Sequence, residues 1–406
     1  MLQGRNLVWA RAHNRTVILH LLQAQETVTR VALASHSRLT RATISNIVGE
    51  FLQLGIVREI GEEVRDSSGR RRTLLQLNPG AFSAIGALIS LGQVDALLVN
   101  ARGDELLRIT IRTDTSSPEN TARALCDAVG RLLAHDSSQW GTGEVVVAVP
   151  GIVDESGAVR YSSHLGWKEV DFATLASTEC GRNVIVENKM FAAAWAEVNP
   201  IYSEDQPLCY VSYGTGIGCC LVNERAVYRG AAQAAGELGH ITVNPNGAVC
   251  ACGNRGCLEA EAAFGAVVKA YRESGGHLAA GWDDSVPLAR RAEAVFSSAE
   301  KGDPVAGAVV RRTSQYVGVA LATVLNLFNP KELVLDLGIR EGREYFRTLI
   351  EEEARQRALS HVVTNVRIRE PRYGSSNPLF GAARMALDRY ISKLGAVRVS
   401  SSDSSI

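Results

Sequence analysis

A cluster of potential metal ligands constrains the fold of this chain more than any other feature of its sequence. It consists of His240, Cys250, Cys252 and Cys257, and glycines stand beside the last two cysteines. Because glycine lets a loop fold back, three thiols and one imidazole can meet at one point, as in a tetrahedral zinc site. The sequence therefore predicts a Zn²⁺ ion bound by these four side chains. Since the protein fills all four positions, we expect the ion to be structural and not to activate water.

The remaining cysteines indicate buried free thiols and not a disulfide framework. They lie in apolar surroundings, at Cys126, Cys180, Cys209, Cys219 and Cys220. No stretch reaches the ~18–20 uncharged apolar residues of a membrane span, and the N-terminal residues lack the apolar core of a signal peptide. We therefore expect a cytoplasmic protein without membrane insertion, in which thiols stay reduced.

Charge is distributed unevenly along the 406 residues, a length that allows two or three domains. The 43 basic and 43 acidic residues cancel over the whole chain, which excludes a polycation that coats nucleic acid. Residues 1–80, however, hold eleven arginines, no lysine and six acidic residues. A basic segment followed by an acidic body predicts different partners for the two parts.

Hydrophobic spacing within residues 1–80 predicts two helices joined by a tight turn and followed by a β-hairpin. Thr29 and Thr40 are suitable N-caps for the two helices. In the second helix apolar residues recur at i, i+3, i+4, i+7 and i+8, up to a left-handed stop at Gly55. Two strand-like runs follow, separated by a polar tip with three arginines. This order is typical of a winged helix-turn-helix domain.

The polar face of the second helix and the hairpin tip carry the side chains expected to contact DNA. Short or donor-rich side chains at the start of a recognition helix suit base edges, and consecutive arginines suit phosphates or a narrow minor groove. The predicted DNA-binding residues are Arg38, Arg41, Thr43, Ser45, Asn46, Arg70, Arg71 and Arg72. The alternative is a small helical domain that binds proteins and carries a solvated charge run.

From residue 84 onward the sequence alternates between strands and helices. Three strand-like runs precede a helix that begins at Pro118 and a wholly apolar strand at 145–149, which is typical of a buried parallel strand. A similar order returns after residue 207, with a long helix at 305–327. The pattern predicts two α/β lobes that bind a ligand in the cleft at the carboxyl ends of their strands.

Ligand-type groups gather beside the predicted metal loop. A glycine turn at 214–218 can present backbone N–H groups to an anion. Glu237 lies three residues before His240, and Glu259 lies two residues after Cys257. Either acid alone could be an ordinary surface residue, but two carboxylates flanking one metal loop are suitable acceptors for sugar hydroxyls.

These motifs resemble those of the ROK family, which is named for its repressors, uncharacterised reading frames and kinases. The resemblance covers about residues 84–390 and rests on the runs 214–218, 235–240, 250–259 and 326–330. It implies two actin-like (ribonuclease H-like) α/β lobes and zinc on the four ligands above. It also implies sugar contacts from Asn188, Glu237, His240 and Glu259, with Gly151 near the sugar. Together with the N-terminal domain, the chain resembles the repressor branch, which includes xylose-, glucose- and N-acetylglucosamine-responsive repressors.

Three departures from the kinase pattern of this family predict that the chain transfers no phosphoryl group. ROK kinases carry a Glu-Asn-Asp motif whose aspartate takes the proton of the attacking hydroxyl, whereas this chain has Lys189 in its place. Loss of a general base costs ~10²–10⁴ in rate. No carboxylate for magnesium stands at 88–92, where the first phosphate loop should fall, and 336–338 lack the double glycine of the nucleotide side.

Lys189 also bears on the ligand. Its ammonium group can donate to sugar hydroxyls, or it can pair with Glu187, Glu237 or Glu259 and hold the empty cleft closed. A cation at this position favours a phosphorylated or acidic sugar more than an aspartate would.

We therefore predict a sugar-responsive repressor of carbohydrate uptake or catabolism genes, not an enzyme, that binds operator DNA as a homodimer or homotetramer. The predicted domains are a winged helix-turn-helix at 1–80, a first lobe at 81–188 completed by a C-terminal helix at about 379–398, and a second lobe at 189–378. The alternatives are a sugar kinase with an added DNA-binding domain and a repressor whose effector is a transporter protein. The identity of the sugar, the operator and the direction of the response stay open.

Overall fold

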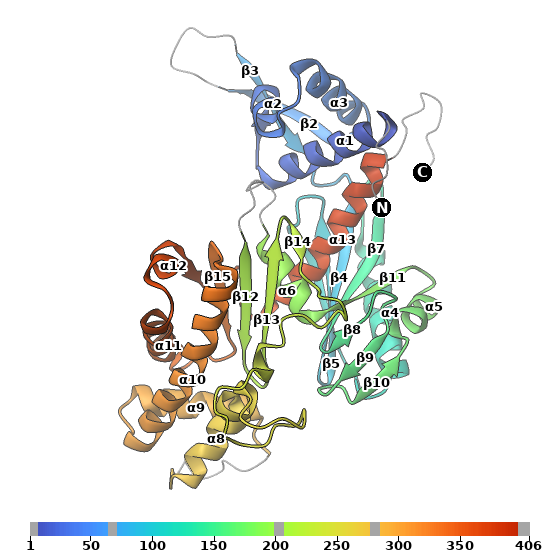
Figure 1. The fold of residues 1–406 in the computed structure, drawn as a ribbon. Coiled ribbons are helices and arrows are strands. Elements are labelled where there is room, and N and C mark those ends of the chain that lie inside the picture. The colour runs from blue at the N-terminus through green and yellow to red at the C-terminus, as the bar shows by residue number, and fades with distance from the viewer. Residues whose placement is uncertain (1–6, 64–70, 199–206, 277–284, 397–406) are drawn as a thin grey trace. The chain divides into compact units, whose positions relative to one another are not determined.

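The computed structural model describes residues 7–63, 71–198, 207–276 and 285–396, and the chain divides into two compact units (Figure 1). Unit 1 comprises residues 1–203 and 378–406, and unit 2 comprises residues 204–377. Helix α6 (Lys189–Glu197), which directly follows the predicted end of the first lobe at residue 188, also belongs to unit 1.

The N-terminal part of unit 1, which we call the head, contains the predicted pair of helices. Its elements are α1 (Leu7–Ala24), β1 (Val28–Thr29), α2 (Arg30–Ser37), α3 (Arg41–Gln53), β2 (Val57–Glu63) and β3 (Arg72–Leu77). Thr29 Oγ1 accepts from the N–H of Ala32 and Thr40 Oγ1 from that of Thr43, both at 3.2 Å, as the capping prediction requires. Gly55 has a φ of 68° directly after α3. Strands β1, β3 and β2 form an antiparallel sheet beside the helices, and the two-residue β1 is too short to be seen in a sequence pattern.

The lobe of unit 1 is built on a mixed sheet with the order β11-β7-β4-β5-β6. These strands are β4 (Ser83–Ser90), β5 (Gln93–Asn100), β6 (Glu105–Arg112), β7 (Thr142–Val149) and β11 (Val184–Asn188). The helices α4 (Pro118–His135) and α5 (Phe172–Cys180) bury their apolar residues on one face, while α6 and α13 (Asn377–Ala396) pack on the other. A smaller sheet is formed by β8 (Ile152–Val153), β9 (Val159–Ser162) and β10 (Trp167–Val170).

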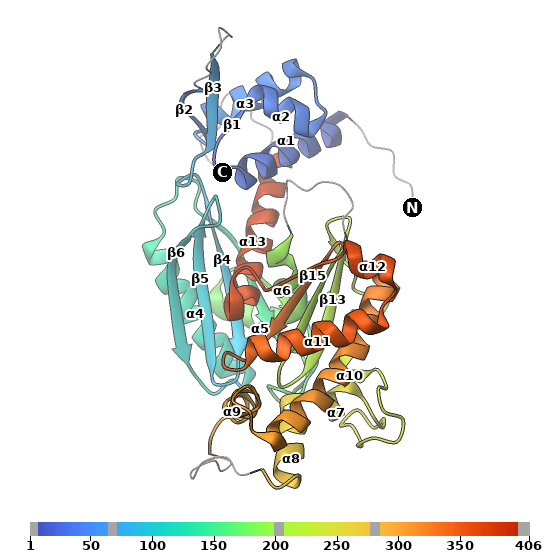
Figure 2. The same cartoon turned by 90° about the vertical axis from the view of Figure 1, so that its left-hand side faces the viewer.

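The head and this lobe share one hydrophobic core, to which residues of α13 contribute. Figures 1 and 2 show α13 running from the lobe to the head. Trp140 Nε1 in the lobe donates to the carbonyl of Leu54 at 3.2 Å, and Gln23 Nε2 in the head donates to that of Ala101 at 3.2 Å. The head is therefore packed against the lobe and is not a separate body on a linker.

Unit 2 contains the second sheet, with the order β14-β13-β12-β15-β16. Its strands are β12 (Leu208–Tyr213), β13 (Ile217–Asn223), β14 (Ala226–Val227), β15 (Glu332–Leu337) and β16 (Arg367–Arg369). The helical elements are η1 (Leu238–His240), α7 (Leu258–Ala262), α8 (Phe264–Glu273), α9 (Leu288–Glu300), α10 (Pro304–Phe328), α11 (Arg343–Arg357), α12 (Ser360–Asn365) and η2 (Gly374–Ser376). Buried rings of Tyr213, Phe264, Phe296 and Phe346 contact one another at the centre of its core. Across the described residues, no helix is both long and apolar enough to cross a membrane, and the cytoplasmic location stays a prediction.

An ion-pair cluster fastens α13 to the sheet of unit 1 and should make the stability of this unit depend on pH. The carboxylate of Glu144 on β7 accepts from Arg389 Nε and Lys393 Nζ at 2.9 Å each and from Asn183 Nδ2 at 2.6 Å. Burial acts to raise the pKa of Glu144, but these three donors outweigh it and lower that pKa to about 2.

Because the folded pKa lies below the ordinary value of 4.5, this carboxylate stabilises the fold fully above pH 4.5 and loses its effect as the pH falls towards 2. We expect Glu144→Gln to lower the free energy of unfolding by about 1–2 kcal/mol at pH 7, after allowance for the exposed basic partners. Calorimetry at pH 7, 4 and 3 should show the difference shrinking below pH 4.5, whereas the exposed control Glu352→Gln should differ little. An equal loss at every pH would contradict the assignment.

Candidate functional site

The four predicted metal ligands converge in unit 2. Their donor atoms all lie within 4.8 Å of one another. Cys250 Sγ lies 3.7 Å from His240 Nδ1, and Cys252 Sγ lies 3.7 Å from Cys257 Sγ. Ligands bound tetrahedrally through zinc–sulfur bonds of ~2.3 Å are about 3.8 Å apart, so the donor set and its spacing fit such an ion. The cluster can hold a metal ion.

Glycine positions and short backbone hydrogen bonds fold the loop that carries these ligands. The N–H of Cys250 donates to the carbonyl of Asn254 at 2.7 Å, and Gly253 has a φ of 92°. At Gly256 a Cβ would lie 1.6 Å from the carbonyl oxygen of Asn244, so a side chain is excluded there. The predicted role of the glycines is thus visible at two residues, and Cys257 leads directly into α7.

The surroundings of the loop shift the pKa values of two of its thiols in opposite directions. The N–H of Asn254, followed by the neighbouring Cys250, lowers the pKa of Cys252. Burial, followed by the other two thiols of the cluster, raises the pKa of Cys257 to about 12. A divalent cation would stabilise all three thiolates together, which is the arrangement that structural metal sites require.

The predicted sugar residues of unit 2 lie around this loop. His240 turns Nδ1 towards the thiols, and its Nε2 lies 3.9 Å from Glu237 Oε2. Partial burial raises the pKa of Glu237, and Glu259 adds to this effect, while His240 opposes it. Glu259 Oε2 accepts the N–H of Ile217 at 3.2 Å and so connects α7 to the glycine turn. Unit 2 therefore brings two carboxylates, an imidazole and the glycine turn into one group.

The other three predicted sugar residues form a second group in unit 1. Asn188 Oδ1 accepts the N–H groups of Met190 and Phe191 and caps α6, while its Nδ2 donates to the carbonyl of Gly151 at 2.7 Å. Gly151 has a φ of 124°, and a Cβ there would lie 2.3 Å from the carbonyl oxygen of Tyr161. Lys189 follows as the first residue of α6 and is half-buried. Among the described residues, the Asn188 amide nitrogen donates to the carbonyl of Gly151, which uses one of its two N–H groups.

The segments that should bind nucleotide phosphates in a ROK kinase take other forms here. The first is a tight turn between β4 and β5, in which Leu91 is 77% exposed and no residue is acidic. The second segment follows the strand that the sequence predicted at 332–335. Strand β15 instead continues to Leu337, so Asp336 belongs to the strand and accepts the hydroxyl of Tyr210 at 2.8 Å.

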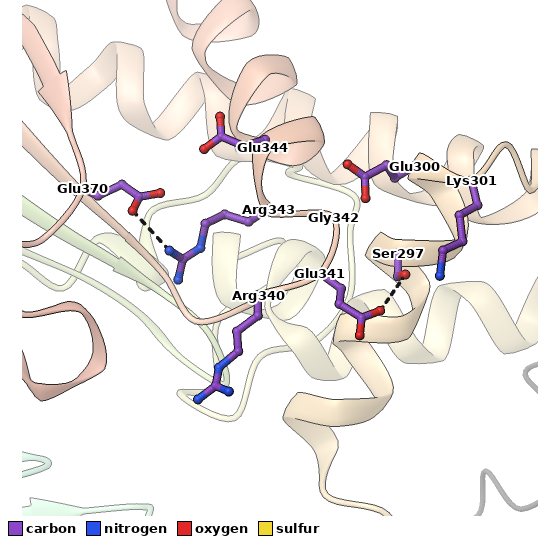
Figure 3. A pocket seen from close by; sticks show the side chains of 9 residues that line it. All are labelled: Ser297, Glu300, Lys301, Arg340, Glu341, Gly342, Arg343, Glu344 and Glu370. Atoms are coloured by element: carbon purple, nitrogen blue, oxygen red, sulfur yellow. Dashed lines mark hydrogen bonds and ion pairs between the residues drawn. The ribbon is translucent and has the colours of Figure 1, made fainter.

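Residues 340–344, which follow β15, line one side of a polar groove of about 610 Å³ (Figure 3). The sequence pattern did not predict this groove. Glu293 on α9 reaches the turn before α11, where its Oε1 accepts the N–H of Arg340 at 2.7 Å and that of Glu341 at 3.2 Å. Burial opposes the charge of Glu293, but these N–H groups and Arg290 outweigh it and lower its pKa. Two backbone donors that could receive an anion therefore already hold a carboxylate of the protein.

An apolar pocket of about 200 Å³ adjoins Glu237 and was also missed, because it combines segments far apart in the sequence. Side chains from β13, from the loop before the metal ligands and from the end of α10 line it, among them Leu221, Leu238, Ile241, Val324 and Phe328.

The predicted recognition helix α3 presents two distinct faces. Its apolar stripe is buried at Ile44, Ile47, Val48 and Phe51. Arg41, Ser45 and Asn46 are exposed on the opposite side. Thr43 is half-buried, and its hydroxyl lies 2.9 Å from that of Thr40, so it belongs to the cap and is less open to DNA than the sequence indicated.

The other predicted DNA contacts lie at the edges of the head. Arg38 is exposed after α2 and has a φ of 58°. Arg71 is exposed and forms an ion pair with Glu62 at 3.1 Å, while Arg72 begins β3 and is half-buried. Arg70 lies outside the described residues.

Comparison with known proteins identifies the class. A model of the ROK family matches residues 89–389. The xylose repressor of Bacillus subtilis is 25% identical over 380 residues, which cover 93% of this chain and 96% of that protein. The DNA-binding transcriptional dual regulator NagC of Escherichia coli is 28% identical over 363 residues, 87% of each chain.

Solved structures show the same fold. A ROK family transcriptional regulator, described as a homologue of the E. coli protein MLC, superposes with a TM-score of 0.78 at 23% identity and covers 95% of this chain and 99% of its own. The ROK hexokinase of Thermus thermophilus, 26% identical with a TM-score of 0.62, covers 77% of this chain and 99% of its own. The chain belongs to the ROK family, as its motifs indicated.

Proposed function

We propose that this protein is a sugar-responsive transcriptional repressor whose head is a winged helix-turn-helix that binds operator DNA. The observation that carries the proposal is the exposed polar face of α3, with Arg41, Ser45 and Asn46 opposite a fully buried stripe. A short polar face of this kind suits base edges in the major groove. The difference in coverage supports the same function, since the regulator matches 95% of the chain and the hexokinase 77%.

The effector we propose is a sugar or sugar phosphate. Asn188 offers an amide donor in unit 1, while Glu237 and Glu259 offer acceptors in unit 2, and Lys189 would favour an anionic substituent. Relatives named for xylose and N-acetylglucosamine support this ligand class. A sugar changes operator affinity only if it binds two states of the protein differently, and such coupling is typically ~1–3 kcal/mol.

The metal we propose is a structural Zn²⁺ ion. His240 Nδ1 and the three thiols would hold it, and it would supply charge that keeps the thiols ionised and the loop closed. The rest of the loop would then hold His240 Nε2, Glu237 and Glu259 ready for sugar hydroxyls. Binding as a homodimer or homotetramer, and a transporter subunit as an alternative effector, stay predictions.

The second candidate function is sugar phosphorylation, which the matched hexokinase favours. Three features argue against phosphorylation. Lys189 replaces the general base, and Leu91 is exposed in the first turn, where a carboxylate for magnesium should stand. The carboxylate of Glu293 already occupies the backbone donors after β15. We expect turnover below ~0.1 per second with ATP, magnesium and a panel of sugars, which is under the range of working enzymes. Faster phosphorylation of any sugar would establish the kinase.

Selection of duplexes from a random library, followed by affinity measurements in the presence of candidate sugars, tests the proposed function. We expect enrichment of a palindromic sequence and a change in its affinity with one sugar among xylose, glucose, N-acetylglucosamine and their phosphates. Absence of any preferred duplex would refute the proposal. If operator affinity responds to a transporter subunit and to no sugar, the effector is a protein.

Glu237→Gln should separate ligand binding from stability. A neutral amide loses a charged acceptor, and hydrogen bonds to charged groups contribute ~1.5–3 kcal/mol, so sugar affinity should fall about 10–100-fold. Because Glu237 is exposed, the melting temperature should change little. Isothermal titration and calorimetry measure the two effects, with Glu224→Gln, an exposed turn residue, as the control. A large loss of stability would show that Glu237 is structural.

A further inference from the structure

Helix α13 lies against both α6 and the first helix of the head in unit 1. It has 20 residues, and glycines allow close approach at its two ends. A Cβ on Gly381 would lie 1.7 Å from the carbonyl oxygen of Ala192 in α6. A Cβ on Gly395 would lie 2.1 Å from Thr16 Oγ1 and 2.9 Å from the carbonyl oxygen of Ala12, both in α1. A side chain at either glycine is therefore excluded, and α13 approaches the backbones of α6 and α1 closely.

A single carboxylate joins the same three helices. Trp195 Nε1 at the end of α6 donates to Asp388 Oδ2 at 2.6 Å. His20 Nδ1 on α1 lies 3.5 Å from Asp388 Oδ1, and the two side chains are only 13% and 15% exposed. A carboxylate in such surroundings needs these partners, because a buried charge without them is strongly unfavourable. The hydrogen bond from Trp195 orients α6 on α13, and the 3.5 Å contact with His20 places the same carboxylate beside α1.

The opposite end of α6 is the candidate sugar residue Asn188, which caps the helix. Nine residues of helix span about 13 Å, and six of those in α6 are buried, four of them alanines, so we expect the helix to move as a rigid body. A ligand that accepts a hydrogen bond from the amide of Asn188 would alter the N-cap of α6. Because the helix is rigid, this change would also shift Trp195 at its other end.

On the side of the head, α1 is fastened to the predicted recognition helix. Arg15 on α1 is buried, lies over the ring of Phe51 and reaches Glu50 Oε2 at 3.5 Å. Arg11 forms a further ion pair with Glu50. Because Glu50 and Phe51 belong to α3, a displacement of α1 is carried to the helix that would read DNA.

We propose that Asp388 is a positioning residue that couples the sugar-binding end of α6 to the DNA-binding head. This inference rests on the proposed function and concerns the route within unit 1 by which a bound sugar changes operator affinity. Trp195 supplies the contact with α6, and His20 supplies the contact with α1.

The first experiment requires no effector. Hydrogen exchange of the full-length protein should show the amides of α1 exchanging at least tenfold faster in Asp388→Asn than in wild type, with α4 unchanged. Trp195→Phe, which removes one donor and keeps an aromatic ring, should give a smaller change in the same direction. Asp127→Asn, an exposed acid on α4 that pairs with Arg131, is the matched control. Wild-type protection of α1 in both variants would overturn the inference.

The second experiment compares operator affinity with and without saturating sugar. For wild type, the ratio of the two dissociation constants should differ from one. In both variants this ratio should be at least fivefold closer to one than in wild type. The sugar affinity of both variants should stay within twofold of the wild-type value. A role in stability alone would leave this ratio unchanged. If wild type responds and the variants respond equally, the coupling is wrong and the proposed function stands. If wild type responds to no sugar, the proposed function fails, and the exchange of α1 still decides whether Asp388 positions the head.

Discussion

Cys252→Ser should abolish binding of one zinc equivalent and destabilise unit 2. Cys252 is the exposed thiol of the cluster, so the substitution removes a ligand without opening a cavity in the core. Any loss of stability therefore reports the metal and not the packing. Because unit 2 has its own apolar core, we expect a loss of about 2–4 kcal/mol and a fall of roughly 5–10 °C in its melting temperature.

The same variant should lose its sugar response, since the metal loop supports the group formed by Glu237, His240 and Glu259. Zinc content by mass spectrometry, calorimetry and sugar titration measure the three effects on one preparation. Cys126→Ser is the control, because that partly exposed thiol lies in unit 1 and outside the cluster. An intact sugar response in a zinc-free protein would contradict the metal assignment.

Substitution of two arginines of the head by alanine should weaken DNA binding in two different ways. Arg41 is exposed at the first turn of α3, where a side chain can reach a base edge. Arg41→Ala should cost about 1–3 kcal/mol, or roughly 5–150-fold in affinity, and relax the preference at one base position. Arg71 lies beside the hairpin tip, so Arg71→Ala should weaken binding to all sequences and reduce the salt slope by about one.

Affinity measured at several salt concentrations, for the selected operator and for each single-base variant, separates the two roles. The ion pair of Arg71 with Glu62 must open for a phosphate contact, so Glu62→Gln should raise affinity slightly and serves as a reciprocal control. Ser177→Ala, on α5 and away from the head, should change neither quantity. If Arg41→Ala preserves the full sequence preference, α3 is not the recognition helix.

The local part of the fold could be predicted because its signals lie within a few residues. The caps at Thr29 and Thr40, the stop at Gly55 and the strands around the glycine turn occur where the pattern placed them. The spacing of cysteines and histidine likewise predicted a cluster that the structure brings together. The caps, the stop and the ligand cluster depend on residues close in sequence, and the helices and strands depend on a periodicity of 3.6 or two.

Other features had only weak signals or none. Strand β1 has two residues and pairs only because β3 lies beside it. The end of β15 was placed too early, because Asp336 is polar, yet Tyr210 on the adjacent strand accommodates it with a hydrogen bond. Thr43 stays a predicted DNA contact, and its hydroxyl also lies 2.9 Å from that of Thr40, a contact that the sequence pattern did not indicate.

Short runs of residues were enough to predict the ROK family, the His/Cys cluster that can hold a metal ion and the exposed polar face of α3. The contact of α13 with the head is visible only in the tertiary structure, whereas the sequence already predicted that this helix completes the first lobe. Trp195 and Asp388, which meet at 2.6 Å, are separated by 193 residues. Glu293 reaches the turn at Arg340 in the same way, from a helix distant in sequence. Such pairs form because burial of apolar faces brings whole elements together, and no local pattern records which elements will meet.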